Sequence, residues 1–206
     1  PETFNHLNLI PELKKRGITV QIGHTNGTYE DGVHALDQGA KSFTHLFNAM
    51  STFQHRAPGI AGAALAHAEF AELIPDLKHV HPGAIKIALK CIPNLYFVTD
   101  STSATGMPDG EYKLGSHVVH KCLGGVRLSD GTLAGSALTM DEAFRNLLTL
   151  GLSPLEISHK LSGVPAQLIE EHSRGSIQVG KFSDFVILNS ENKIDSVIIE
   201  GEKCDF

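Results

Sequence analysis

One stretch of the sequence decides the fold class: LYFVTD, residues 95–100. Aromatic and β-branched residues favour a strand. A strand that is apolar on both faces is typical of a parallel sheet covered by helices. Shorter runs of the same kind precede it at residues 18–23, 41–47 and 70–74. The stretch ends in Asp100, so a carboxylate stands where the last of these strands stops.

Helical segments separate the predicted strands. Residues 28–39 begin at Thr28, which offers an N-cap, and Asp31 follows three residues later as its partner in a capping box. A second helix is predicted over residues 82–90. Strands that alternate with helices in this way predict an α/β fold with a parallel sheet.

The pattern changes after Asp100. Residues 111–126 are rich in Gly, Val and His and predict short antiparallel strands. Further along, helices are predicted over 138–150, 154–161 and 166–170, and strands over 177–181, 185–188 and 196–201, with a turn at 189–193. The last strands resemble a small β unit that is separate from the α/β layer.

Composition excludes several classes of function. The chain has 206 residues, of which 41% are hydrophobic, and this is enough to build a core. A net charge of −6 without a basic run argues against nucleic-acid binding. No apolar stretch reaches the roughly 18 residues of a membrane helix, so no membrane partner is expected. The three cysteines, Cys91, Cys122 and Cys204, lie far apart and favour a reducing, cytoplasmic location. Because the first residue is Pro1, we expect a fragment or a processed piece.

Polar residues stand where the predicted strands end. His24 directly follows the first strand, His45 lies near the end of the second, and Asp100 ends the fourth. Asp76 and His79 follow the third strand. The carboxyl ends of parallel strands share one edge of the sheet, where ligands bind. Two imidazoles and a carboxylate suit Zn²⁺ or Fe²⁺. A carboxylate beside such a metal acts as general base and then as general acid.

A structural role for the same residues stays open at this point. A single histidine at the end of a strand is more often structural or solvated than a metal ligand. Asp100 is also well placed to cap the turn at residues 101–103, a common use of aspartate. The occurrence of polar residues at successive strand ends makes the two interpretations about equally favoured.

A set of motifs adds a family resemblance. They are GHTN at 23–26, THLFNAM at 44–50, HRAPG at 55–59, TD at 99–100 and GTLAGS at 131–136. Together they closely resemble the N-acetylglucosamine-6-phosphate deacetylase family of the amidohydrolase superfamily. The resemblance covers the whole chain, but only the C-terminal half or so of a full-length member. It implies an α/β fold: the C-terminal half of a TIM-like (β/α)8 barrel over residues 1–175, with a β-rich insertion near 111–136. Residues 176–206 would be the C-terminal strands of a small β-sandwich.

The resemblance also implies roles for individual residues. His24 and His45 match metal ligands, and Asp100 matches the catalytic aspartate. Zn²⁺ is the first choice for the divalent metal, with Fe²⁺ or another ion as an alternative. The residues that match substrate-binding positions are Asn48, Ala49, Arg56, His79, Leu133, Ala134 and Gly135, the last three in a loop that closes on the substrate. Arg56 would bind the phosphate across the interface of a homodimer.

The implied reaction is hydrolysis of the acetamide of N-acetylglucosamine 6-phosphate to glucosamine 6-phosphate and acetate. Two alternatives stay open: another amidohydrolase that acts on a cyclic amide, and a non-catalytic truncated fragment that binds sugar phosphate. The third metal ligand of the family, a glutamate on an earlier strand, is not in this chain. Where the family usually has Asp-Gly-x-His, the chain has DLKH at 76–79, so Leu77 replaces a glycine beside His79.

Overall fold

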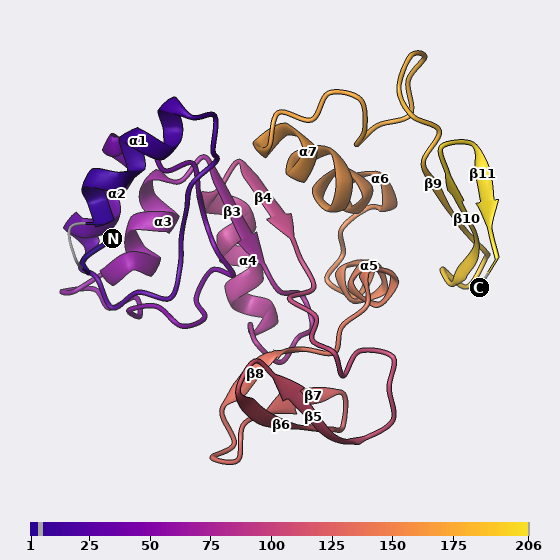
Figure 1. Ribbon diagram of the computed structural model, residues 1–206, viewed down its shortest axis with the longest axis horizontal. Helices are drawn as coiled ribbons and strands as arrows, with labels where there is room; N and C mark the ends of the chain where they lie inside the picture. The colour runs from indigo at the N-terminus through magenta and orange to yellow at the C-terminus, as the bar shows by residue number, and fades with distance from the viewer. Residues whose placement is uncertain (4–5, 206) are drawn as a thin grey trace.

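Parallel strands and covering helices form the first half of the molecule (Figure 1). The computed structural model describes residues 1–3 and 6–205. Strand β1 (Gln21–Ile22) pairs in parallel with β2 (Ser42–Phe43), and β3 (Phe70–Leu73) pairs in parallel with β4 (Asn94–Phe97). A backbone hydrogen bond of 2.8 Å, from Leu46 N to Glu72 O, joins β2 to β3. The expected α/β layer with parallel strands is therefore confirmed.

Helices precede the first strand and connect the four strands. A short 3₁₀ turn η1 (His6–Asn8) and α1 (Leu9–Lys15) come before β1, and the connecting helices are α2 (Tyr29–Gln38), α3 (Gly59–His67) and α4 (Pro82–Cys91). The predicted capping box is present, since the side chain of Thr28 accepts from Asp31 N and Asp31 accepts from Thr28 N. Helix α2 ends at Gly39, whose φ of 109° lies in the left-handed region that favours glycine.

Two sequence expectations for this half were wrong in detail. The first two strands were predicted over 18–23 and 41–47, but only Gln21–Ile22 and Ser42–Phe43 pair, because the chain turns away from the sheet just beyond them. Helix α3 was not predicted. Its residues Gly59 to Ala64 are all buried, so the helix has no polar face and leaves no helical periodicity in the sequence.

An antiparallel sheet follows Asp100, as the composition of 111–126 predicted. It contains β5 (Gly110–Leu114), β6 (His117–Cys122), β7 (Gly125–Arg127) and β8 (Leu133–Ser136) in that order. This sheet lies below the α/β layer in Figure 1. A parallel bridge between Ser101 and Ser136 attaches its last strand to the chain that leaves β4.

The remaining elements run from Met140 to the C-terminus. They are α5 (Met140–Thr149), α6 (Pro154–Ser158), a π-helical segment η2 (His159–Gly163), α7 (Val164–Leu168), and the antiparallel strands β9 (Phe185–Leu188), β10 (Ile194–Ile199) and β11 (Glu202–Cys204). The strand predicted at 177–181 is absent from the described residues. Its apolar side chains are exposed, Ile177 by 82%, so no sheet pairing was there to bury them. The division at residue 175 stays a prediction.

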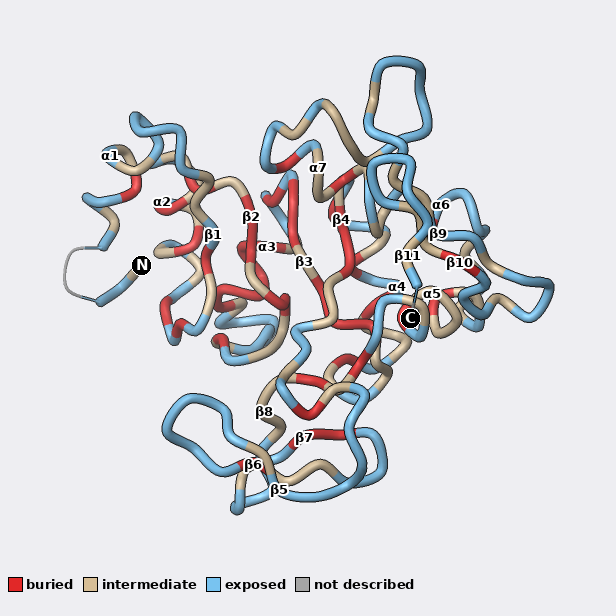
Figure 2. Tube along the Cα trace, turned by 45° about the vertical axis from the view of Figure 1, so that its right-hand side comes forward, coloured by how far each residue is buried: buried red, intermediate tan, exposed pale blue. Residues whose placement is uncertain are grey.

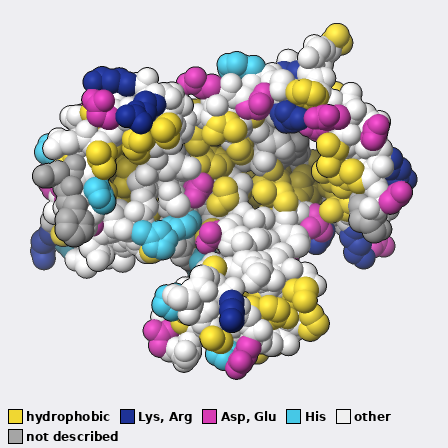
Figure 3. Space-filling model, viewed as in Figure 1, with side chains coloured by type: hydrophobic (Ala, Val, Ile, Leu, Met, Phe, Trp, Pro, Cys, Tyr) yellow, Lys and Arg dark blue, Asp and Glu magenta, His cyan; other side chains and the backbone are white. Residues whose placement is uncertain are grey.

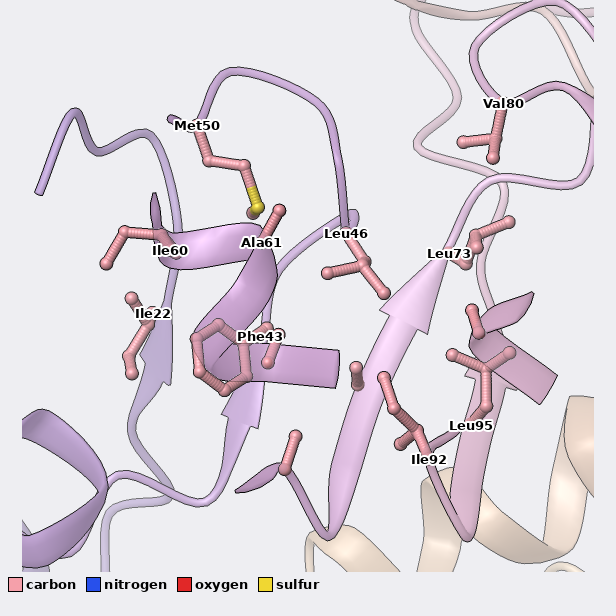
Figure 4. Close-up of a cluster of buried hydrophobic side chains, with 14 of the residues drawn as sticks. Ile22, Phe43, Leu46, Met50, Ile60, Ala61, Leu73, Val80, Ile92 and Leu95 are labelled. Atoms are coloured by element: carbon pink, nitrogen blue, oxygen red, sulfur yellow. The ribbon is translucent and has the colours of Figure 1, made fainter. Parts of the chain in front are cut away.

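The main hydrophobic core lies between the strands and their helices. Figure 4 shows Ile22, Phe43 and Ile60 on one side of it and Leu73 and Leu95 on the other. Figure 2 shows buried residues concentrated in the α/β layer, whereas the outer loops are mostly exposed. In the part of the chain that the structure describes, no helix is both long and apolar enough to cross a membrane.

Phe43 is expected to be a main contributor to stability because its side chain is fully buried in this core. Phe43→Ala should lower the free energy of unfolding by about 3–5 kcal/mol. Phe53→Ala is the matched control, since that ring is 57% exposed and should cost roughly 1 kcal/mol or less. Urea unfolding monitored by circular dichroism measures both. Equal losses in the two variants would contradict the placement of the core.

Candidate functional site

Two histidines converge where β1 and β2 end. His24 Nε2 and His45 Nε2 lie 3.0 Å apart, and the two rings meet edge to face with centroids separated by 4.7 Å. His24 is exposed, whereas His45 is only 6% exposed. Figure 3 shows histidine side chains gathered at the surface between the α/β layer and the sheet below it, with an acidic side chain close by. The sequence expectation that these two imidazoles meet at one edge is therefore confirmed.

The pair matches part of a metal's coordination shell. Nitrogens bound to one zinc ion at about 2.0–2.1 Å would lie about 3–3.4 Å apart, close to the separation seen here. His45 Nδ1 is buried and has no hydrogen-bond partner among the described residues. Within residues 1–3 and 6–205, no group of three or more His, Cys, Asp or Glu side chains converges. The described residues therefore offer two ligands, His24 and His45, to a metal ion.

A partly buried carboxylate holds the backbone of His45. Glu72 on β3 accepts from His45 N through Oε1 at 3.0 Å, and its Oε2 lies 3.1 Å from the hydroxyl of Tyr96 on β4. The same hydroxyl also lies 3.1 Å from Gln21 Oε1 on β1. Burial, together with the nearby Glu72 carboxylate, raises the pKa of Tyr96, so the hydroxyl stays protonated and donates. Side chains from three strands thus form a hydrogen-bonded layer that contacts the backbone of His45.

The loop after β3 forms a tight turn around Asp76. The carboxylate accepts from Lys78 N at 2.9 Å, from His79 N at 2.8 Å and from His79 Nδ1 at 2.6 Å. Both the Asp76 and His79 side chains are nearly buried, at 6% and 5% exposed. Burial acts to raise the pKa of Asp76, but the hydrogen bonds from His79 and Lys78 outweigh it and the pKa is lowered. The hydrogen bond at Nδ1 therefore fixes the ring of His79, and Nε2 can contact a ligand.

Asp100 follows β4 and is exposed. Its carbonyl oxygen accepts from Ser136 N at 2.8 Å, at the end of β8. A Cβ added to Gly135 would stand 2.6 Å from Thr102 Cγ2 and 3.1 Å from that oxygen, and the Gly135 φ of 67° lies in the left-handed region, so glycine is favoured where the two backbones lie this close. The end of β8 is therefore brought against Asp100.

Several candidate residues share an unusual backbone conformation. His24, His45, Ala49 and Asp100 have positive φ values of 45°, 28°, 50° and 50°, although each carries a Cβ. Such conformations are costly and persist only where surrounding contacts impose them, which happens most often at functional sites. The strand ends that carry the candidate residues are thus held away from relaxed geometry.

The substrate-binding candidates after β2 lie in two places. Asn48 uses its side-chain amide within the turn, donating to His45 O and Leu46 O at 3.3 Å. The backbone of Ala49 accepts from Thr25 N at 2.9 Å, which ties this turn to the residue after His24. Arg56 is exposed and lines a hollow of about 660 Å³ between residues 26–30 and 50–59.

Leu133, Ala134 and Gly135 required a correction. A loop was implied for them, but they lie in strand β8, because their backbone pairs with β7 through the Arg127–Leu133 and Gly125–Ser136 positions. The sequence analysis also missed the contributions of Glu72 and Tyr96 and did not assign Asp76 a role. A charged residue in the middle of the apolar run FAEL, residues 70–73, was the signal that pointed to Glu72.

Removal of the Tyr96 hydroxyl should destabilise the protein. Tyr96→Phe leaves Glu72 Oε2 without its donor in a partly buried place, and the free energy of unfolding should fall by about 1–3 kcal/mol. Tyr112→Phe is the control, because that hydroxyl donates to Pro108 O in an exposed loop. Denaturant unfolding of both variants tests the layer, and a Tyr96→Phe protein as stable as the control would show that Glu72 does not need this donor.

Asp76 should make stability depend on pH in the acid range. Its folded pKa is lowered, so its stabilisation is fully present above the ordinary value of about 3.9 and is lost as pH falls through the folded value. Asp76→Asn should therefore be less stable than the wild type at pH 7, and the difference should shrink below about pH 4. Urea unfolding at pH 3, 4, 5 and 7 measures the difference in the free energy of unfolding between the two proteins. A difference that stays constant with pH would contradict a lowered pKa for Asp76.

Comparison with known proteins places the chain in a family. The model of the amidohydrolase family matches residues 7–204. The chain is 38% identical over 205 residues to N-acetylglucosamine-6-phosphate deacetylase of Vibrio furnissii, which is 98% of this chain and 51% of that protein. It is 36% identical over 210 residues to N-acetylgalactosamine-6-phosphate deacetylase of Escherichia coli O157:H7, covering 100% of this chain and 56% of that protein.

A solved structure supports the same family assignment. The structure of mutant N-acetyl-D-glucosamine-6-phosphate deacetylase from Mycobacterium smegmatis, in complex with N-acetyl-D-glucosamine-6-phosphate, superimposes with a TM-score of 0.92 at 31% identity, over 98% of this chain and 55% of that one. The chain thus spans about half the length of the relatives that it matches. Since the family model covers nearly the whole sequence, this chain belongs to the amidohydrolase family.

Proposed function

We propose that the full-length protein hydrolyses the acetamide of N-acetylglucosamine 6-phosphate to glucosamine 6-phosphate and acetate. The observation that carries the proposal is the convergence of His24 and His45 at the ends of adjacent parallel strands, at 3.0 Å between their Nε2 atoms. Similarity to deacetylases of acetylated hexosamine 6-phosphates supports the substrate class. The free cysteines agree with a reducing, cytoplasmic location.

The proposal extends to the architecture. We infer that β1–β4 are half of a TIM-like (β/α)8 barrel and that β9–β11 belong to a small β-sandwich. The rest of a full-length protein would supply the other barrel strands, together with a glutamate as the third metal ligand. The carboxyl ends of the strands would then form the mouth of the barrel, where such enzymes carry their active sites.

His24 and His45 would hold the divalent metal, with Zn²⁺ as the first choice because imidazole suits it. When bound, such a metal lowers the pKa of a water and polarises the substrate carbonyl. Asp100 would accept the proton of the attacking water and deliver it to the leaving nitrogen as the C–N bond breaks. His79, held through Nδ1 by Asp76 at 2.6 Å, would present Nε2 to the acetyl oxygen.

The phosphate would bind to the loop after β2. Arg56 has a planar guanidinium that matches phosphate oxygens, and it lies exposed at the hollow next to residues 26–30. Asn48 and Ala49 would complete the contacts to the sugar phosphate, and Leu133 to Gly135 on β8 would border the substrate. An exposed arginine on a long loop suits a homodimer in which Arg56 reaches the partner's site.

Asp100→Asn tests the chemistry in the full-length protein. The amide keeps the size of the side chain but cannot take up the proton, so kcat should fall by roughly 10²-fold or more. Bound metal should stay unchanged. Asp37→Asn, on the exposed face of α2, is the matched control and should keep its wild-type kcat. A kcat for Asp100→Asn within about threefold of wild type would leave Asp100 with only a structural role.

Arg56→Ala tests the phosphate site. A charge-assisted contact of about 1.5–3 kcal/mol converts to a rise in KM of roughly 10- to 150-fold for the 6-phosphate. The KM for unphosphorylated N-acetylglucosamine should hardly change. Arg16→Ala, which removes another exposed arginine, serves as the control. If KM rises equally for both substrates, the substitution has disturbed the loop and Arg56 does not recognise phosphate.

A subunit-mixing experiment tests the dimer. Arg56→Ala and Asp100→Asn subunits are each defective, but in a mixed dimer one site regains both residues if Arg56 acts across the interface. Activity should therefore partly recover after subunit exchange. If exchange is demonstrated and activity stays at the level of the separate variants, Arg56 acts within its own chain.

A further inference from the structure

We propose that Lys78 is a positioning residue that fixes the β5–β8 sheet against the turn that carries His79. This rests on the proposed function, in which His79 and the β8 residues Leu133 to Gly135 meet the same substrate. Lys78 is the third residue of the Asp76–His79 turn and lies between two segments whose relative placement would define the site.

The contact itself is short and specific. Lys78 Nζ donates to Gly124 O at 2.6 Å, in the turn between β6 and β7. A Cβ added to Gly124 would stand 2.7 Å from Nζ, so the lysine lies directly against this turn. Leu123 and Gly124 have φ values of 51° and 68°, which is the backbone of a tight two-residue hairpin turn. The carbonyl that Lys78 contacts is therefore held in a defined direction.

The other end of the contact is equally constrained. Lys78 N donates to Asp76 Oδ1, the same oxygen that accepts from His79 N. Leu77 between them is held in the left-handed region, at a φ of 61°. The backbone of Lys78 is therefore fixed to the same nearly buried carboxylate that orients the ring of His79, and its side chain leaves from a rigid turn.

The contact reaches β8 through one pair of strands. Gly125, next to Gly124, pairs with Ser136, and an added Cβ at Gly125 would stand 3.9 Å from the Cδ2 atom of Leu133. The same Ser136 donates from its backbone N to Asp100 O. The β5–β8 sheet is thus attached through Ser136 on β8 and, through Lys78, at the neighbouring β6–β7 turn. The second attachment restricts rotation of the sheet about the first.

The test uses Lys78→Met in the full-length protein, which keeps the length of the side chain and removes the donor. Lys121→Met is the matched control, since Lys121 Nζ also donates to a backbone carbonyl of the same region, that of Met107, but does not touch the His79 turn. Loss of one hydrogen bond predicts a rise in KM of roughly 3- to 10-fold, with kcat within about twofold of wild type. Lys78→Arg, which restores a donor, should recover most of the wild-type KM.

Amide hydrogen exchange supplies a readout that does not depend on activity. Lys78→Met should speed hydrogen exchange of the β7 and β8 amides, at residues 125–127 and 133–136, by roughly 3- to 10-fold. Lys121→Met should leave the exchange rates of these amides unchanged. Unchanged exchange and KM in Lys78→Met would overturn the inference. A KM effect confined to phosphorylated substrate would also overturn it, because Lys78 would then bind phosphate directly. If the wild-type full-length protein hydrolyses no acetamide, the proposed function fails, while the exchange result still decides the role of Lys78.

Discussion

The carboxylate of Glu72 is the constraint on which the candidate site depends. It accepts from the backbone of His45 on one side and lies within hydrogen-bonding distance of the Tyr96 hydroxyl on the other. Together with the bond from Leu46 N to Glu72 O, this joins the two pairs of parallel strands at the level where the polar residues begin. The donors offset the cost of removing this partly buried carboxylate from water. The layer therefore depends on these donors, which fix how β2 and β3 lie beside each other.

Strain at the strand ends follows from this fixed arrangement. His24, His45 and Asp100 each adopt a positive φ immediately beyond a strand. In a free chain such conformations would relax, but here neighbouring strands and the turns after them bond the adjacent backbone, as Thr25 N does to Ala49 O. The strain thus directs polar side chains toward the common edge instead of along the strands, and this turning of the chain also explains why the paired part of β1 and β2 is so short.

The sequence predicted the alternation of strands and helices, the capping box at Thr28 and the meeting of His24 with His45. These features depend on local patterns and on the general geometry of parallel sheets. It did not predict α3, whose small apolar residues are buried all round, or the role of Glu72, which depends on a hydroxyl 24 positions away at Tyr96. Roles for Asn48 and Arg56 came only from family resemblance, since an asparagine in a turn and an exposed arginine have no distinctive local pattern.

Leu77 illustrates how tertiary contacts override a local preference. A glycine at this position would adopt the left-handed conformation without strain, whereas leucine adopts it here at a φ of 61°. Three donors on the Asp76 carboxylate require that turn, and the leucine side chain gains packing against the main core. The replacement of the family's glycine by Leu77 therefore leaves the turn around Asp76 closed. Since the same turn also anchors Lys78, the cost of strain at one residue supports both the orientation of His79 and the attachment of the β5–β8 sheet.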